Sequence, residues 1–556
     1  MFKKAFLLLT AFCLIFNLVD AQTTRLVNPI LAGFYPDPSI IKVGKDYYLV
    51  NSTFAYFPGI PIFHSTDLKN WKQIGNVIDR PSQMNFMGDR VTRGLFAPAI
   101  NYHNGTFYIT CTQIDHKGNF VVTAKNPAGP WSDPAFLPSV RGIDPSLFFD
   151  KDKAYVVYNG DAPDYKPLYS GHRTIRMNEF DPVKLTASAE NQILVNGGVD
   201  ISKKPVWIEG PHIMKVGNWY YLYAAEGGTS VNHSEVVLRS KSATGPFVPY
   251  ENNPILTQRG LPADRKDPVT SAGHADFVEG PDGKWYAIFL AVRPYEDDYY
   301  NTGRETFIAP VTWKDEWPVI NADVKEIQYS YATNIKENKT PGLQPQSGNF
   351  KYSVALNKPL DYSFLFLRTS DPSWYSIGKD GLTMKLKSET CAGTGNPAFI
   401  AKRQQHLNCS FDTELSFDTD KAYEKAGLVI FQNEEHYYYI CKSVDEKQRP
   451  VVQLYKSGKA GETELLTEQP LTANAQGKLQ LRIRSNGAFY AFDYATTAGK
   501  WTTLKDNVDG KFLSTHTAGG FVGCVFALYA TSNGKETTST AKFTRVDYAG
   551  NDSVYR

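Results

Sequence analysis

The sequence has little of what a disulfide scaffold, a zinc protein or a nucleic-acid-binding protein needs. It contains six cysteines in 556 residues. The five that follow the N-terminal leader are Cys111, Cys391, Cys409, Cys441 and Cys524. Their odd number and scattered spacing argue against a disulfide framework and against a zinc site, although a single bridge between Cys391 and Cys409 stays open. The formal net charge is +2, so nothing indicates a nucleic acid or a membrane surface as a partner.

Long hydrophobic runs are also rare, and the one that stands out is at the N-terminus. Lys3 and Lys4 precede an apolar run over residues 5–19, which ends at the small-residue site Val19-Asp20-Ala21. This order is typical of a secretory signal peptide, and the run is shorter than a membrane anchor requires. We therefore expect residues 1–21 to be a signal peptide and the protein to be exported, to the periplasm or the extracellular space.

Helical periodicity of useful length is missing between residues 30 and 320, and a β-type unit recurs there instead. The five copies are DPSIIKVGKDYY from Asp37, APAINYHNGTFY from Ala97, DPSLFFDKDKAY from Asp144, EGPHIMKVGNWY from Glu209 and HADFVEGPDGKWY from His274. The last aromatic lies 11 residues after the first residue in four copies and 12 in the fifth. Five all-β units predict a five-bladed β-propeller; the alternative is a β-sandwich with accidental similarity.

Equivalent positions of the blades meet around the axis of a propeller, so the first residue of each copy is predicted to lie on one ring. That ring would bring together three acids, Asp37, Asp144 and Glu209, with His274. Crowded buried carboxylates are costly unless they are used or paired. Two kinds of site fit them: a Ca²⁺ or Mg²⁺ site with oxygen ligands, and a glycoside hydrolase site.

Glycoside hydrolysis needs one carboxylic acid to protonate the leaving oxygen and one carboxylate to activate water. A hydrolase also accounts for aromatic residues near the ring, because aromatic faces can stack on sugars. Packing within the blades is the other explanation for each of them. These aromatic residues are Phe54, Tyr56, Phe57 and Phe96.

Six motifs, in order and in register, carry a resemblance to a known family. They are GFYPDPSI, FAYFPGIPIFHSTDLKNW, GIDPSLFF, EGPHI, GHADFVE and GRETFIAPV. From about residue 28 to the C-terminus the chain resembles glycoside hydrolase family 43, specifically the β-xylosidase and α-L-arabinofuranosidase group that carries a C-terminal β-sandwich. The resemblance implies a five-bladed propeller and an inverting mechanism.

The motifs also imply roles for the three acids. Asp37 is similar to the general base of the family and Glu209 to its general acid. Asp144 is similar to the residue that tunes the pKa of the acid and orients it. His274 resembles the central histidine beneath the site, which in the family often lies beside a bound Ca²⁺ or Na⁺. No cofactor is implied for the chemistry itself.

Three further residues are expected to contact the sugar. Arg304, in GRET, resembles the arginine that clamps sugar hydroxyls and the base. Phe54 matches a sugar-stacking aromatic. Phe96 stands where the family often has Trp, which leaves a smaller stacking surface.

The pattern of the chain changes after about residue 312, which predicts a second domain. We expect the propeller over residues 22–325 and a linker over residues 326–350. Alternating apolar and polar runs over residues 351–556 predict a β-sandwich, and the resemblance implies a concanavalin-like one. Related sandwiches close the propeller pocket with an aromatic residue; Phe521 is the candidate here, although a buried strand residue is the alternative.

The sequence thus predicts a secreted inverting exo-glycosidase. It would release terminal xylose, arabinofuranose or both from xylan- or arabinoxylan-derived oligosaccharides of the plant cell wall, with no nucleic-acid or membrane partner. Two alternatives stay open, an arabinan-degrading hydrolase and a non-catalytic carbohydrate-binding protein. Xylose and arabinofuranose present similar hydroxyls, so the sequence does not decide between them.

Overall fold

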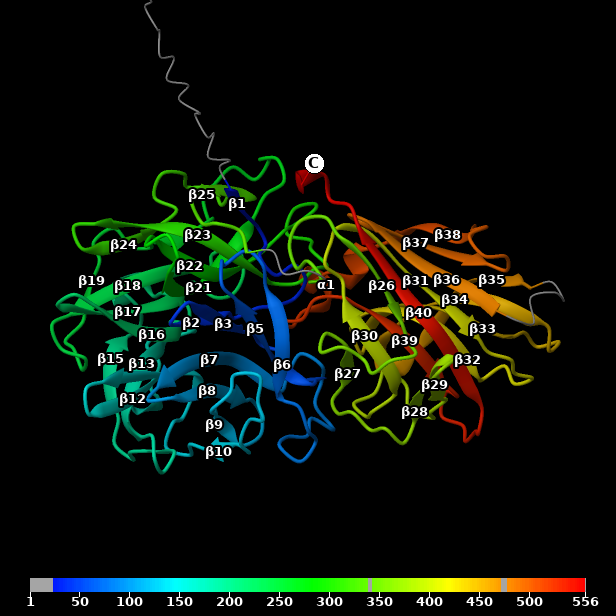
Figure 1. The fold of residues 1–556 in the computed structure, drawn as a ribbon, viewed down its shortest axis with the longest axis horizontal. Helices are drawn as coiled ribbons and strands as arrows, with labels where there is room; N and C mark the ends of the chain where they lie inside the picture. Colours follow the sequence, from blue (N-terminus) through cyan, green and yellow to red (C-terminus); the bar gives the residue numbers. More distant parts are fainter. Residues whose placement is uncertain (1–23, 339–342, 472–477, 556) are drawn as a thin grey trace, which may run out of the picture.

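The computed structural model describes residues 24–338, 343–471 and 478–555. The expected signal peptide lies outside these residues. The described chain forms two lobes side by side, an N-terminal propeller and a C-terminal β-sandwich (Figure 1). The predicted all-β fold class is thereby confirmed. Within the described ranges, no helix is both long enough and apolar enough to cross a bilayer.

Each blade of the propeller is one sheet formed by a continuous stretch of chain. Four strands, from the axis outward, form each blade, and blades three and four each carry one more. Blade one contains β2 (Ser39–Val43), β3 (Asp46–Val50), β5 (Gly59–Ser65) and β6 (Lys72–Ile78), and blade two contains β7 (Leu95–His103), β8 (Thr106–Gln113), β9 (Gly118–Ala124) and β10 (Ala135–Phe136). Blade three contains β11 (Ile143–Asp150), β12 (Lys153–Asp161), β13 (Arg173–Asp181), β14 (Thr186–Ala187) and β15 (Gln192–Asn196), and blade four contains β16 (Glu209–Val216), β17 (Trp219–Glu226), β18 (Ser234–Ser240), β19 (Val248–Pro249) and β20 (Leu256–Thr257). Blade five contains β21 (Thr270–Glu279), β22 (Trp285–Val292), β23 (Glu305–Lys314) and β24 (Trp317–Ile320).

The innermost strands β2, β7, β11, β16 and β21 each contact the next, so the ring is closed. Five clusters of buried apolar side chains fill the spaces between neighbouring blades. The last blade is joined to the first by Asp276, whose Oδ2 accepts hydrogen bonds from Ser39 Oγ and from the Ile40 amide, both at 2.9 Å. Burial between blades, rather than a shared strand, therefore holds the propeller together.

The second lobe consists of two packed antiparallel sheets, with one apolar core between them. Residues of β31 (Asn408–Ser416) alternate between buried and partly exposed along the whole strand, as expected when one face covers a core. Its sheet also contains β26 (Lys351–Ala355), β28 (Tyr375–Gly378), β29 (Gly381–Lys385), β36 (Lys478–Asn486), β37 (Phe489–Ala495), β38 (Thr502–Asp509) and β40 (Thr540–Gly550). The facing sheet contains β27 (Leu365–Leu367), β30 (Ala398–Arg403), β32 (Lys425–Asn433), β33 (His436–Val444), β34 (Pro450–Ser457), β35 (Thr463–Pro470) and β39 (Val525–Thr531).

The two lobes share a sheet, which the sequence did not indicate. Strand β4 (Tyr56–Phe57) leaves the first blade and pairs with β27, so it becomes the edge strand of the sandwich. Tyr56 is buried at the interface between the lobes and Phe57 between the first two blades, so neither lines the cavity as the sequence suggested. In the expected linker, β25 (Ser330–Thr333) pairs with β1 (Thr24–Val27) of the propeller.

Short helices complete the described chain. One α-helical turn, α1 (Thr515–Ala518), precedes β39. The 3₁₀ turns are η1 (Pro163–Tyr165), η2 (Ile201–Lys203), η3 (Lys459–Gly461), η5 (Lys511–Leu513) and η6 (Ser553–Tyr555). All five cysteines after the leader are buried and free, so the bridge considered between Cys391 and Cys409 does not form.

Candidate active site

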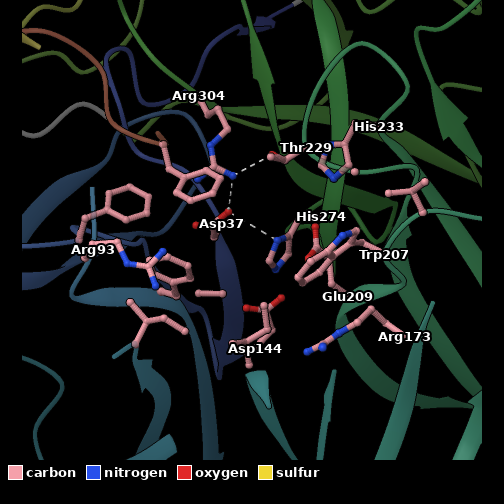
Figure 2. A pocket seen from close by; sticks show the side chains of 18 residues that line it. Asp37, Arg93, Asp144, Arg173, Trp207, Glu209, Thr229, His233, His274 and Arg304 are labelled. Carbon is pink, nitrogen blue, oxygen red and sulfur yellow. Dashed lines mark hydrogen bonds and ion pairs between the residues drawn. The ribbon is translucent and has the colours of Figure 1, made fainter. Parts of the chain in front are cut away.

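A cavity of about 540 Å³ lies at the ring of the propeller (Figure 2). The structure brings together in its wall every residue to which the sequence analysis assigned a role in the site. These residues are Asp37, Phe54, Phe96, Asp144, Glu209, His274, Arg304 and Phe521. Seven of them come from the propeller, and Phe521 comes from the sandwich. The cavity is thus a joint product of both lobes.

The ring differs from the predicted one at a single blade. Strand pairing slips at a β-bulge in the innermost strand of blades two to five, and the bulge of blade four lies between Glu209 and His212. Its first residue is Gly210, which has φ 57°, as Asp144 has φ 57° and His274 has φ 55°. Glu209 therefore precedes the ring position by one residue, and Gly210 occupies it. The sequence pattern matched Glu209 to the ring through its distance to Tyr220, whereas strand pairing shows that the equivalent aromatic is the next residue, Tyr221.

Gly210 has two reasons to lack a side chain. A Cβ there would lie 2.6 Å from Nε2 of His274, closer than packing allows. Its positive φ also belongs to the left-handed region that glycine adopts without cost. Its amide donates a hydrogen bond of 3.0 Å to Asp144 Oδ2. Gly210 thus ties the backbone beside Glu209 to the neighbouring acid and lets His274 sit directly beneath.

Asp37 is held in its ionised form. Its Oδ1 accepts a hydrogen bond of 3.1 Å from Arg304 Nη1 and lies 3.5 Å from His274 Nδ1, and its Oδ2 accepts one of 2.6 Å from Ser52 Oγ. Burial by itself would raise the pKa of Asp37. The charge of Arg304, the imidazole of His274 and the Ser52 hydroxyl outweigh burial and keep the pKa below its usual value.

Glu209 and Asp144 are shifted in the opposite direction. Burial, together with the charges of Asp144 and Asp37, raises the pKa of Glu209 to about 8. Burial and the charge of Asp37 raise the pKa of Asp144 to about 7. No hydrogen bond from any described residue reaches the Glu209 carboxyl, and the charges of Arg304 and Arg173 offset the rise in its pKa only in part. At neutral pH the cavity therefore pairs an ionised carboxylate, Asp37, with a protonated acid, Glu209.

Three phenylalanines cover one wall of the cavity. Phe521 stacks on Phe54, with ring centroids 6.1 Å apart and planes inclined by 19°. Phe96 meets both edge-on, at 5.7 and 5.5 Å. Phe521 lies in the loop between α1 and β39 rather than in a strand, and its amide donates to Thr92 Oγ1 at 2.7 Å. A hydrogen bond across the domain interface thus holds the sandwich aromatic over the propeller site.

Sequence reasoning missed five polar or aromatic residues of the cavity wall. They are Arg93, Arg173, Trp207, Thr229 and His233. Four of them lie outside the strands, and Arg173 begins β13, so none belongs to the repeated β-type unit of the sequence. Thr229 Oγ1 accepts a 3.0 Å hydrogen bond from Arg304 Nη1, the same nitrogen that donates to Asp37, and so helps to fix the guanidinium. No local pattern marked these residues.

The implied cation beside His274 finds few ligands among the described residues. No group of three or more His, Cys, Asp or Glu side chains there is arranged to hold a metal ion. Burial lowers the pKa of His274 to about 4, so the ring is neutral. One imidazole and one carboxylate fall short of the roughly six to eight oxygen ligands that Ca²⁺ takes. An ion at this place stays a prediction.

Comparison with known proteins gives the family. Residues 26–318 match glycosyl hydrolases family 43, and residues 356–549 match the β-xylosidase C-terminal concanavalin A-like domain. A xylosidase/arabinosidase of Butyrivibrio fibrisolvens is 37% identical over 91% of this chain and 96% of its own. A non-reducing end α-L-arabinofuranosidase of Bacteroides ovatus is 35% identical over 94% of both chains.

The solved structures agree with this result. A GH43_12 protein from a capybara gut metagenome is 41% identical, has a TM-score of 0.85 and covers 92% of this chain and 95% of its own. A xylan β-1,4-xylosidase of Bacillus halodurans is 29% identical, with a TM-score of 0.83, over 94% of this chain and all of its own. The chain therefore belongs to glycoside hydrolase family 43 and is a glycoside hydrolase.

Proposed function

We propose that this protein is an exported, inverting exo-glycosidase that releases terminal xylose, arabinofuranose or both from xylan-type oligosaccharides. The observation that carries the proposal is the opposite shift of two pKa values in one cavity. Asp37 is ionised beside Arg304, and Glu209 keeps its proton to about pH 8. The names of the relatives, xylosidase/arabinosidase and α-L-arabinofuranosidase, support pentose glycosides as substrates.

The reaction proceeds in one step. The Glu209 carboxyl gives its proton to the glycosidic oxygen as the bond from that oxygen to the anomeric carbon breaks. Asp37 takes a proton from a water whose oxygen bonds to the opposite face of the same carbon. Each of these proton transfers contributes roughly 10²- to 10⁴-fold. Exchange of one proton with solvent at each carboxyl then restores the starting state.

The other polar groups orient this pair. Asp144 accepts from the Gly210 amide and so fixes the backbone that carries Glu209, while its charge helps to keep Glu209 protonated. Arg304 bridges Asp37 and Thr229 through Nη1, and its buried Nε has no partner among the described residues. We assign Phe54, Phe96 and Phe521 to contact with the terminal sugar.

A panel of nitrophenyl glycosides tests the substrate class: β-xyloside, α-L-arabinofuranoside and a hexose as control. Turnover of the hexose alone would contradict the proposal. Product analysis on xylo-oligosaccharides tests the exo action, since random cuts within the chain would exclude it. Proton NMR of the first-formed sugar tests the stereochemistry: a β-xyloside should yield α-xylose before mutarotation. Early β-xylose would overturn the inverting mechanism.

A further inference from the structure

Trp207 is a large aromatic side chain left uncovered at the cavity. It lies between η2 and β16, two residues before Glu209, and lines the same wall. The side chain is 38% exposed, whereas Phe54, which also lines the cavity, is almost completely buried. An apolar ring exposed inside a binding cavity is a ready contact surface for a ligand.

The backbone holds Trp207 in an unfavourable conformation. Its φ of 48° lies in the left-handed region, which is costly for a bulky residue. Two hydrogen bonds fix the segment: the Trp207 amide donates to Gly171 O at 3.0 Å, and the Gly227 amide donates to Val206 O at 2.8 Å. Strain of this kind persists where the surroundings enforce it, commonly at functional sites. The ring is thus presented to the cavity by a rigid support.

One face of the indole already has a partner. The Arg173 guanidinium carbon lies 4.8 Å from the centre of the ring. Arg173 itself is fixed, because Nε and Nη2 donate to Asn159 Oδ1 at 3.0 and 2.8 Å, and Nη1 forms an ion pair with Asp161. Since Asp161 balances its charge, Arg173 orients the ring without favouring an anionic ligand.

The location of Trp207 relative to the two acids indicates which part of a substrate it would meet. The phenylalanine wall lies beside Arg304 and Asp37, on the side where water attacks the terminal sugar. Trp207 lies on the Glu209 side, and Figure 2 places it across the cavity from Arg93. Glu209 protonates the leaving oxygen, so the departing part of the substrate must lie beside it.

We propose that Trp207 forms a subsite for the leaving group, in which the second, neutral sugar ring of the substrate stacks on the indole face that Arg173 leaves free. This inference rests on the proposed function. It extends that function, because it makes the enzyme favour a terminal pentose linked to another sugar over one linked to a small alcohol.

The test compares leaving groups with the same terminal sugar. We would measure kcat/KM of wild type, Trp207→Ala and Trp207→Phe on xylobiose and on methyl β-D-xyloside, whose leaving group has no ring. If the wild type prefers arabinofuranose, arabinofuranosyl-xylobiose and methyl α-L-arabinofuranoside take their place. Nitrophenyl glycosides are unsuitable, because their ring can itself stack on Trp207. Trp219→Ala is the matched control: Trp219 lies outside the cavity and also packs against an arginine, Arg239, at 4.2 Å.

We expect Trp207→Ala to lower kcat/KM about tenfold on the disaccharide and less than about twofold on the methyl glycoside, with Trp207→Phe restoring most of the loss. Trp219→Ala should leave the ratio unchanged. In the inactive Glu209→Gln background, Trp207→Ala should weaken xylobiose binding about tenfold by calorimetry.

Equal losses on both substrates, or no loss on either, would overturn the subsite while leaving the proposed function intact. A wild-type enzyme that hydrolyses neither pentoside would overturn the proposed function and the subsite with it.

Discussion

Two clusters of buried charge lie close together in this molecule, and they are built in opposite ways. At the domain interface Arg293 pairs with Glu305 at 2.6 Å and with Asp552 at 2.8 Å, so each charge meets one of opposite sign. In the cavity, Arg304 pairs with Asp37 alone, at 3.1 Å, and neither Asp144 nor Glu209 has an ion-pair partner among the described residues.

Arg304 and Glu305 are neighbours in the chain, yet they belong to different clusters. Glu305 joins Arg293 at the interface and accepts from the Gly33 amide at 2.7 Å, while Arg304 faces the cavity. Buried charges that are ion-paired hold the two lobes in register. The two acids without an ion-pair partner, Asp144 and Glu209, have pKa values raised to about 7 and about 8, as a proton donor at neutral pH requires.

The largest expected effect comes from removing the ionised carboxylate of the cavity. Asp37→Asn should lower kcat by at least about 10²-fold, because general base catalysis is lost. The fold should persist, since the isosteric amide can still accept from Ser52. Steady-state kinetics and circular dichroism check this. A mutant that kept more than about a tenth of the wild-type kcat would exclude Asp37 as the base.

The second-largest effect should come from removing the protonated acid, Glu209. Glu209→Gln should cost at least about 10²-fold on a natural glycoside, and less on a nitrophenyl glycoside, whose leaving group needs no proton. The raised pKa also predicts that wild-type kcat/KM falls as the pH rises through about 8. If the fall in kcat/KM at alkaline pH persisted unchanged in Glu209→Gln, a group other than Glu209 would be responsible for it.

Breaking the ion-paired cluster at the domain interface should affect stability instead. Arg293→Met leaves Glu305 and Asp552 buried without a positively charged partner, which should lower the free energy of unfolding by about 3–5 kcal/mol. Thermal denaturation measures this change. The control is Lys153→Met, which removes an exposed pair with Glu179 and should leave Tm unchanged. Equal stability of Arg293→Met and wild type would show that the interface does not depend on this cluster.

The smallest expected effect is a pH-dependent change in folding stability when the Glu209 carboxyl is replaced. The pKa of Glu209 is raised to about 8 in the folded state, against about 4.5 when unfolded. The folded state therefore binds this proton more tightly, and its contribution to stability is present below about pH 4.5 and lost as the pH rises through about 8. The amide introduced by Glu209→Gln carries no charge. The free energy of unfolding of this variant should therefore exceed that of the wild type by about 1–2 kcal/mol at pH 9, and should not exceed it at pH 4.

For Asp37→Asn we expect a change in stability of the opposite sign. In the folded wild type the pKa of Asp37 is lowered. The ionised carboxylate therefore stabilises the protein at pH values above the pKa of the unfolded state, and this contribution is lost as the pH falls. Asp37→Asn should therefore be less stable than wild type at pH 7. Denaturant titrations at pH 4, 7 and 9 check both variants. Shifts of the same sign would contradict the assigned protonation states.

The sequence by itself determined the five blades, because each blade is continuous in the chain and repeats a local pattern of bulge, turn and aromatic. It also determined that Asp37, Asp144 and His274 meet, because equivalent positions of a closed ring converge, and it placed Glu209 within one residue of that ring. Alternation of apolar and polar residues likewise identified the sandwich.

Only the tertiary structure decided what depends on distant parts of the chain. The bulge that moves Glu209 off the ring position is defined by its pairing with β17, and β4 joins the sandwich through a partner more than 300 residues away. The pKa values of Asp37 and Glu209 follow from desolvation and from the placing of Arg304. Trp207 takes its place from a strained loop held by Gly171 and Arg173. Such terms depend on three-dimensional neighbours, which no local pattern in the sequence contains.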